Sequence, residues 1–385
     1  MTDFLDVVRV IQNVFWILSS ILVLIALPAI FYKPKRAHYP AKNVEIIIVS
    51  IASNKVRKAL YETIRNVEEF TRRYNLSFKI LIDEGAELEN ELRSKFMENL
   101  IIVPKNYRRD LIGKGRALNY FVENYVRDNY WYTFLDDDNI ILSPDFLYEI
   151  AYYEEKKEYA ATNPILVPRM GKSSITYIMD FIRFFDDLFF FRFFTGLVGK
   201  PLIGLHGELL TVRGSVLREI GFCRRSLTED FQFAIELVKR GYKTWHSRTR
   251  VSIRSPNSIK DLLFQRGRWF KGVFLEIFHA PLHMKLITII RMIMWILGLL
   301  GTFALGLILG VSYFPLLTLP AGIYYSSAYL YGFFRYVFER RREVWNKEIF
   351  RTIVILFSIP FLGIIENISW IFGLKIKNFI VLDKN

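Results

Sequence analysis

The stretch that decides the fold is WYTFLDDDN, residues 131–139, an apolar run that ends in three consecutive carboxylates. Similar short apolar runs precede it, namely VEIIIVSI at 44–51, FKILID at 78–83 and LIIVP at 100–104. Continuous apolar runs of this length are typical of strands buried on both faces. The charged segment 55–74 has apolar residues at helical spacing. The alternation predicts an α/β domain with a mostly parallel sheet, whose ligands bind beyond the carboxyl ends of the strands.

The composition indicates a membrane-associated protein that also has a polar domain. Hydrophobic residues make up 52% of the 385 residues, yet 23% are charged, which is too many for a bundle of membrane helices alone. The formal net charge of +14 suits an anionic membrane surface. A basic balance also suits nucleic acid, but the long apolar runs exclude that reading. The single cysteine, Cys223, excludes an intramolecular disulfide.

Four apolar segments are long enough to cross a bilayer, which takes about 20 helical residues. They lie at 11–32, 286–311, 313–336 and 349–373. A basic cluster, Lys33 to Lys42, follows the first segment, and such clusters stay on the cytosolic side. We therefore expect an N-terminal transmembrane helix in residues 1–40, a cytosolic domain in 41–284 and a C-terminal transmembrane region in 285–385. The protein would be integral to the plasma membrane, or to the endoplasmic reticulum in a eukaryote.

The last apolar segment differs from the others because it contains Pro360, Glu366 and Asn367. An ionisable side chain at membrane depth is expensive and usually functional. Four complete crossings would also place the C-terminus outside the cell. We therefore favour a re-entrant or tilted interfacial segment, with Glu366 near the functional site.

The acidic triplet is the first candidate site. Side chains alternate across a strand, so Asp136 and Asp138 are expected to point the same way. Two carboxylates can hold Mg²⁺ or Mn²⁺ through oxygen and leave positions for diphosphate and water. The alternative is a plain polar turn after a strand, where Asp is common. The two further motifs below favour a metal site.

The second motif is Thr228-Glu229-Asp230 in RRSLTEDF. Asp230 is suited to a general base that takes a proton from an attacking hydroxyl, with Glu229 in a supporting role. The neighbouring carboxylate or burial would raise the pKa of Asp230 toward the working pH. The following segment is amphipathic, so the three residues can also cap a helix. A capping residue can still carry chemistry.

The third motif is FQRGRWFKG, which contains Gln265, Arg268 and Trp269. Apolar residues interleave with Lys and Arg over 259–279, as expected of a helix in the membrane interface. Arg268 matches the geometry of a diphosphate, and Trp269 offers a flat face to a sugar ring. A second interfacial helix is predicted near 175–194, for anchoring rather than catalysis.

The three motifs, in this order before a membrane region, resemble the cellulose-synthase-like branch of glycosyltransferase family 2. Its D, DxD, TED and QxxRW motifs match over about residues 44–272. The resemblance implies a GT-A fold, which is Rossmann-like with a mixed, mostly parallel sheet, and an inverting, metal-dependent transfer from a nucleotide sugar. It assigns donor contacts to Ser50, Ala52, Asp83, Lys114 and Asp136, beside Arg268. It also makes Asp138 the main metal ligand, with Asp136 near the donor sugar, and Asp230 the base.

Other parts of the resemblance bear on the acceptor and on the C-terminus. IGLHGELL at 203–210 is most similar to the invertebrate glycosphingolipid β-1,4-mannosyltransferases, which implies GDP-mannose as donor and a lipid-linked sugar as acceptor. We assign His206, Glu208, Gln265 and Trp269 to the acceptor, although His206 can equally be structural and Glu208 replaces a small hydroxyl residue. FIVLDK at 379–384 is similar to a gating loop of the branch, which would bring Lys384 to the donor; Leu382 departs from its pattern.

Three functional hypotheses follow. The favoured one is a membrane-bound mannosyltransferase that uses Mn²⁺ or Mg²⁺ and acts on a polyprenyl-phosphate-linked or glycolipid acceptor. A processive polysaccharide synthase using UDP-glucose or UDP-GlcNAc is the alternative, but it needs more membrane helices to extrude its product. A membrane scaffold or lipid transporter with an inactive domain predicts loss of a charged motif residue, and none is lost.

Overall fold

The computed structural model describes residues 2–299, 315–341, 348–376 and 384. Its centre is an eight-stranded sheet in the order β3-β2-β1-β4-β7-β6-β8-β5. The strands are β1 (Val44–Val49), β2 (Ser77–Asp83), β3 (Leu100–Val103), β4 (Trp131–Asp136), β5 (Ile140–Ile141), β6 (Tyr159–Arg169), β7 (Leu210–Arg213) and β8 (Lys243–Arg254). β1 to β4 pair in parallel, whereas β7 runs antiparallel to both β4 and β6. The predicted mixed, mostly parallel sheet is confirmed.

Two hydrophobic cores cover the faces of this sheet. The residues of β1 are all buried, and they alternate between one core with Phe121 and Phe134 and another with Leu60 and Trp245. The helices of this domain are α2 (Arg57–Tyr74), α3 (Glu89–Phe96), α4 (Lys114–Tyr125), α5 (Asp145–Tyr153), α7 (Gly214–Ile220) and α8 (Glu229–Lys239). Short 3₁₀ turns, η2 (Asn54–Val56) and η3 (Met97–Asn99), precede α2 and β3.

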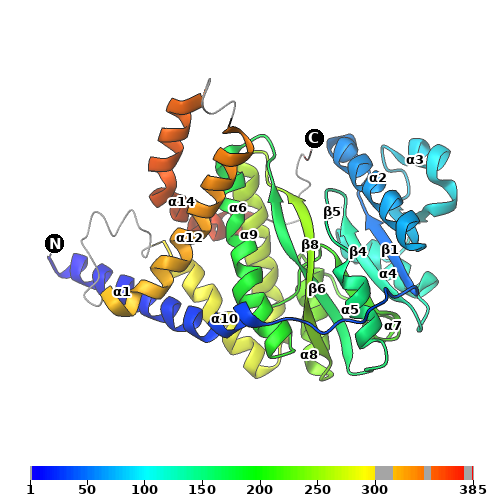
Figure 1. Ribbon diagram of the computed structural model, residues 1–385, viewed down its shortest axis with the longest axis horizontal. Helices are drawn as coiled ribbons and strands as arrows, with labels where there is room; N and C mark the ends of the chain where they lie inside the picture. Colours follow the sequence, from blue (N-terminus) through cyan, green and yellow to red (C-terminus); the bar gives the residue numbers. More distant parts are fainter. Residues whose placement is uncertain (1, 300–314, 342–347, 377–383, 385) are drawn as a thin grey trace.

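Two further helices lie between the sheet and the apolar helices (Figure 1). α6 (Ser174–Asp186) continues as the π-helical segment η4 (Asp187–Leu197), and α9 (Ile259–Glu276) ends in η5 (Ile277–His279). Each starts at a serine whose hydroxyl accepts a backbone N–H, from Thr176 to Ser173 and from Asp261 to Ser258. Both predicted helices, at 175–194 and 259–279, are present.

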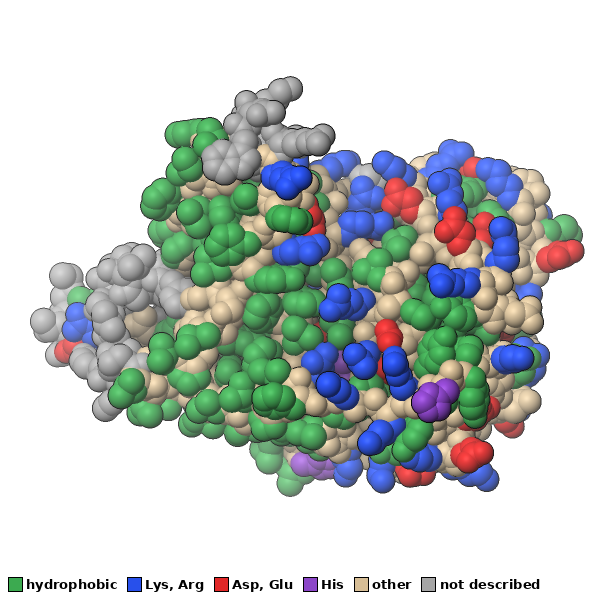
Figure 2. Space-filling model, in the orientation of Figure 1, with side chains coloured by type: hydrophobic (Ala, Val, Ile, Leu, Met, Phe, Trp, Pro, Cys, Tyr) green, Lys and Arg blue, Asp and Glu red, His purple; other side chains and the backbone are tan. Residues whose placement is uncertain are grey.

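Among the described residues, four apolar helices gather at the other end of the molecule, namely α1 (Thr2–Ala26, continued by η1, Leu27–Phe31), α10 (Leu282–Leu297), α12 (Pro315–Glu339) and α14 (Ile349–Lys375). Figure 2 shows hydrophobic side chains over this end and Lys and Arg over the sheet domain. Two described segments, Phe4–Phe31 and Ile349–Lys375, are long and apolar enough to cross a membrane. The predicted segment at 286–311 and the start of that at 313–336 extend outside the described residues.

The last apolar segment is one continuous helix that includes Pro360. The helix does not turn back at Pro360, Glu366 or Asn367, as a re-entrant segment would, and the tilted interfacial form stays a prediction. α14 packs tightly on α9 because two glycines meet there: a Cβ built on Gly267 would lie 2.6 Å from the backbone nitrogen of Gly373. α14 therefore packs directly against α9, the helix that carries the Gln265–Trp269 motif.

Candidate active site

A cavity of about 580 Å³ joins all three sequence motifs. It begins at the carboxyl ends of β1 and β4, as expected for an α/β sheet, and continues past α6 and α9 into the apolar helices. The site residues predicted from the sequence line it, with Ala52 as the exception. The Ala52 methyl group is fully buried in a core instead, and its φ of 46° puts this residue in the left-handed region. Ala52 therefore shapes the loop rather than facing the cavity.

The three carboxylates of the acidic triplet form ion pairs with two different lysines. Nζ of Lys384 lies 2.8 Å from Oδ1 of Asp137 and 2.9 Å from Oδ1 of Asp138. Asp136 instead pairs with Lys114 at 2.5 Å. Asp136 and Asp138 both line the cavity but pair with different lysines, and β4 ends at Asp136, so strand alternation does not continue to Asp138. The residue missed in the triplet is Asp137.

The oxygens of Asp137 and Asp138 fit a hard divalent cation. They converge on one ammonium group, so this position already favours positive charge. Ser50 orients the pair, since its hydroxyl donates to Oδ2 of Asp137 at 2.9 Å. In the described part of the chain, no group of three or more His, Cys, Asp or Glu side chains converges. A metal here would therefore need further oxygens from the donor and water.

Two more predicted donor residues lie on the same side of the cavity. Asp83, at the end of β2, pairs with Arg116 of α4 at 2.5 Å. Lys114 is the first residue of α4 and lines the cavity. Burial disfavours its charged form, but Asp136 and Glu229 outweigh this and raise the pKa of Lys114. Lys114 therefore stays positively charged in the part of the cavity that Asp83, Lys114 and the acidic triplet line, which we call the donor half after its predicted ligand.

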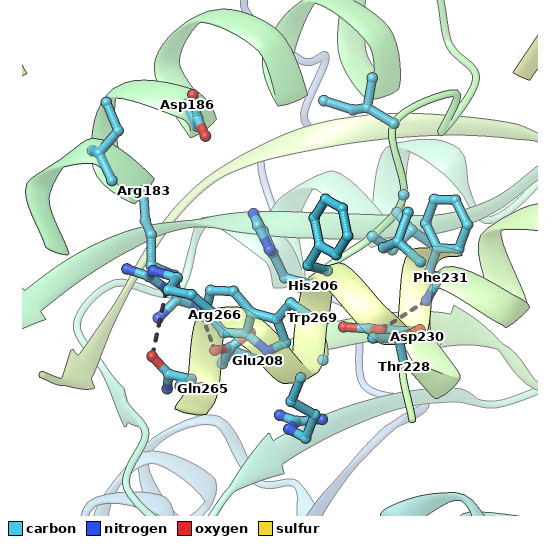
Figure 3. Close-up of a pocket in the computed structure, with 18 of the residues that line it drawn as sticks. Arg183, Asp186, His206, Glu208, Thr228, Asp230, Phe231, Gln265, Arg266 and Trp269 are labelled. Atoms are coloured by element: carbon cyan, nitrogen blue, oxygen red, sulfur yellow. Dashed lines mark hydrogen bonds and ion pairs between the residues drawn. The ribbon is translucent and has the colours of Figure 1, made fainter. Parts of the chain in front are cut away.

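Asp230 has the properties that a general base requires. Burial, followed by the charges of Glu229 and Glu208, raises the pKa of Asp230 to about 7. Its Oδ1 accepts the backbone N–H of Phe231 at 2.8 Å, which fixes the carboxylate at the start of α8 (Figure 3). Thr228 is the N-cap residue of α8, as the capping alternative predicts, but its side chain makes no capping hydrogen bond.

Gly207 leaves space between Asp230 and Lys114. A Cβ built on Gly207 would lie 3.4 Å from Nζ of Lys114 and 3.7 Å from Oδ2 of Asp230. These are ordinary contact distances, so the absent side chain leaves room between the two groups.

The third motif lines the opposite wall. Arg268 donates to the backbone carbonyl of Leu227 at 2.7 Å, which ties α9 to the segment before Asp230. The guanidinium groups of Arg183 and Arg266 lie 4.8 and 4.4 Å from the ring centroid of Trp269. Figure 3 shows Trp269 between these arginines and Asp230. Gln265 accepts from Arg266 at 3.4 Å, at the outer end of this group.

His206 and Glu208 are held by residues that the sequence did not single out. Nε2 of His206 lies 2.7 Å from Asp187. Burial alone would lower the pKa of His206, but the charge of Asp187 outweighs this effect and raises the pKa. Glu208 forms an ion pair with Arg183 at 2.6 Å. Burial opposes ionisation of Glu208, but Arg183 holds its pKa at about 2. Both side chains line the cavity, so His206 is at once structurally held and available to a ligand.

The sequence reasoning missed the residues that organise this wall. They are the partners Arg183, Asp187, Arg266 and Asp180. The signal that could have found them is charge within an otherwise apolar stretch: DFIRFFDD at 180–187 places four ionisable groups on a helix rich in phenylalanine. Charged groups in such surroundings are buried only when paired.

A mixed sheet with carboxylates at the end of a central strand, facing a buried carboxyl group of raised pKa across a cavity, is the arrangement of a GT-A glycosyltransferase. Residues 131–365 match the family described as "Glycosyl transferase family group 2", and the chain belongs to this family. It is therefore a glycosyltransferase.

Relatives and a solved structure agree with this assignment. The chain is 25% identical over 332 residues to the β-1,4-mannosyltransferase egh of Drosophila melanogaster, covering 81% of this chain and 71% of that protein. The β-1,4-mannosyltransferase bre-3 of Caenorhabditis elegans is 23% identical over 334 residues, with the same coverage of 81% and 71%. The fold is similar to that of the mannosyltransferase PcManGT from Pyrobaculum calidifontis in complex with GDP-Man and Mn²⁺, with a TM-score of 0.54, 14% identity and coverage of 94% of this chain and 99% of that one.

Proposed function

We propose that the protein is an integral membrane, inverting mannosyltransferase that transfers mannose from GDP-mannose to a lipid-linked sugar, with its catalytic domain in the cytosol. The β-1,4-mannosyltransferases named above support the sugar and the β linkage. The segments Phe4–Phe31 and Ile349–Lys375 support membrane insertion, in the plasma membrane or the endoplasmic reticulum.

The observation that carries the proposal is the placement of Asp230. An inverting transfer needs one base on the face opposite the leaving group, and Asp230 faces the donor half across the space above Gly207. Its pKa of about 7 allows the carboxylate to accept a proton at neutral pH and still to be ionised beforehand. Glu229, whose pKa is also raised by burial, keeps that value high by like-charge repulsion.

The donor half supplies charge for the diphosphate. Lys114 lines it as a cation and Arg268 faces it from the opposite wall, and we assign both to the diphosphate oxygens. Asp138 and Asp137 would hold Mn²⁺ or Mg²⁺, and the metal would neutralise charge on the departing nucleoside diphosphate. Ser50 and Asp83, at the ends of β1 and β2, are assigned to the nucleoside, and Lys384 to the donor as well.

The test is hydrolysis of nucleotide sugars by the detergent-purified protein with Mn²⁺. GDP-mannose, UDP-glucose, UDP-GlcNAc and UDP-galactose are compared, with Asp230→Asn as the inactive variant and the exposed Glu69→Gln as the matched control. Turnover of GDP-mannose alone, lost in Asp230→Asn and kept in Glu69→Gln, is the expected result. Preference for a UDP-sugar would contradict the mannose assignment and favour the polysaccharide synthase.

A further inference from the structure

Three elements meet where the chain leaves its first apolar helix. The turn η1 ends at Phe31, and the ring of the next residue, Tyr32, packs against η4: a Cβ built on Gly196 would lie 2.6 Å from that ring. η4 is tied in turn to β8, because Oγ1 of Thr244 donates to the backbone carbonyl of Thr195 at 2.9 Å. The end of the apolar helix is therefore fixed against the sheet domain.

Four basic side chains gather where η1, η4 and β8 meet, namely those of Lys33, Arg192, Arg248 and Arg250. We call these four residues the junction cluster. Arg248 and Arg250 are exposed and Thr249 between them is buried, so the two arginines point to the same face of β8. Lys33 is exposed just after η1, whereas Arg192 of η4 is half-buried. Figure 2 shows Lys and Arg gathered between the hydrophobic end and the sheet domain.

The carboxylates of the protein do not neutralise the junction cluster. Within the residues that the structure describes, none of its four side chains forms an ion pair. Asp187 of η4 is fully buried and already accepts from His206 and from the backbone N–H of Leu166, each at 2.7 Å. Glu149, behind β8, is fully buried too and accepts from Nε1 of Trp245 at 3.0 Å. The junction cluster therefore keeps an excess of positive charge.

Arg192 is the member of the cluster that most needs an anion. Burial lowers the pKa of its guanidinium, and the charges of Arg248 and Arg250 lower it further, although Asp187 acts in the opposite direction. A cation that is partly removed from water costs free energy unless an anion pairs with it. A negative group bound between the three arginines would relieve their mutual repulsion.

Apolar side chains next to the cluster indicate where this anion comes from. Phe31 is 82% exposed, Leu197 50% and Val198 44%. Phe31 and Leu197 adjoin Tyr32 and Gly196, which contact each other, so they lie close together. Exposed apolar side chains beside cations are typical of a surface that lies in the membrane interface. A soluble anion would account for the arginines but would leave these side chains in water.

We propose that the junction cluster binds the phosphate of an acidic phospholipid, in the leaflet next to the sheet domain. The three arginines would surround the phosphate, and Phe31 and Leu197 would lie among the acyl chains. None of the four cluster residues lines the reaction cavity, so the site is separate from the donor and the acceptor. The inference rests on the membrane insertion proposed above, but not on the identity of the sugar.

The first test measures lipid binding by the full chain in detergent. The probes are phosphatidylglycerol and phosphatidylcholine with the same fluorescent acyl chain, since both carry a phosphate but only the first has a net negative charge. We expect phosphatidylglycerol to bind at least about tenfold more tightly at low salt. Replacement of the three arginines together, as Arg192→Gln, Arg248→Gln and Arg250→Gln, should remove this preference.

A matched control removes the same amount of charge from α2, at the exposed positions Arg65→Gln, Arg72→Gln and Arg73→Gln. This control should keep the preference for phosphatidylglycerol. Equal binding of the two lipids by the wild type, or an equal loss in the control, would overturn the proposal. Displacement of phosphatidylglycerol by an equal concentration of inorganic phosphate would also overturn it, because the site would then bind a soluble anion.

The second test locates the surface in lipid vesicles. A fluorophore attached at Leu197→Cys, in a chain with Cys223→Ser, should be quenched by lipids that carry a nitroxide near the head group. The same label at Met97→Cys should not be quenched, since Met97 is 71% exposed beside β3, at the opposite edge of the sheet from β8. A label at Ile21→Cys reports insertion of α1 itself. Quenching at Ile21→Cys but not at Leu197→Cys would overturn the lipid site alone, and quenching at neither would overturn membrane insertion as well.

Discussion

The dependence of activity on pH follows from the surroundings of Asp230. Burial, Glu229 and Glu208 raise the pKa of Asp230 to about 7, and the base acts only when ionised. With that pKa, about a tenth of the carboxylate is ionised at pH 6 and about a hundredth at pH 5. We therefore expect kcat/KM to fall about tenfold per pH unit below pH 7 and to level off above it.

The assay is donor hydrolysis from pH 5 to 9 at fixed Mn²⁺. Glu208→Gln removes a negative charge that helps to raise the pKa of Asp230, so the acidic limb should move to lower pH. Glu69→Gln, at an exposed site on α2, should leave the limb where it is. A limb centred near pH 4, or one unmoved by Glu208→Gln, would refute the assignment of Asp230 as a base tuned by its neighbours.

Four further outcomes are expected. Asp230→Asn should lower kcat by about 10²- to 10⁴-fold. The Tm of Asp230→Asn relative to the wild type should also rise as the pH is raised from 4 to 8. Between pH 3.8 and about 7 the folded wild type binds one proton more than the unfolded chain, so the wild type becomes less stable as pH rises through this range, whereas the variant does not. Gly207→Ala should lower turnover without lowering Tm, since the added Cβ enters the space between Lys114 and Asp230 at 3.4 and 3.7 Å from their side chains; a lowered Tm would mean that the site is structural. EDTA should abolish donor hydrolysis and Mn²⁺ restore it, and Asp138→Asn should raise the Mn²⁺ concentration needed; activity in EDTA would contradict a metal site. Gly373→Leu should cost about 1–3 kcal/mol because its side chain would meet the backbone of α9, whereas Gly322→Leu, where a Cβ meets nothing within 4 Å, should be neutral in thermal unfolding.

The parts of the fold that the sequence predicts are those where burial and periodicity agree. β1 and β4 are buried on both faces and therefore form continuous apolar runs in the sequence. β2 and the edge strand β3 are only partly buried, but their residues are mostly apolar as well. β6 and β8 were missed because β6 contains two prolines and β8 mixes arginine and lysine with apolar residues. Strand pairing made these segments strands despite their composition.

The candidate site divides in the same way. The three motifs were expected to meet, and they do line one cavity: the triplet follows β4, Asp230 lies at the start of α8, and Gln265–Trp269 lie within α9. The pairing of Arg266 with Asp180 and Glu366 was not predictable, since it joins residues 86 positions or more apart through helix packing. The pairing of Asp137, rather than Asp136, with the same lysine as Asp138 was not predicted. It depends on β4 ending at Asp136, and a run of three identical residues does not show where a strand ends.

The most direct test of the account is the anomeric configuration of the sugar released from GDP-α-mannose, followed by proton NMR in the first minutes of hydrolysis. Attack assisted by Asp230 on the face opposite the diphosphate predicts β-mannose as the first product, before mutarotation. Release of α-mannose first would contradict a single-displacement mechanism and, with it, the role of Asp230.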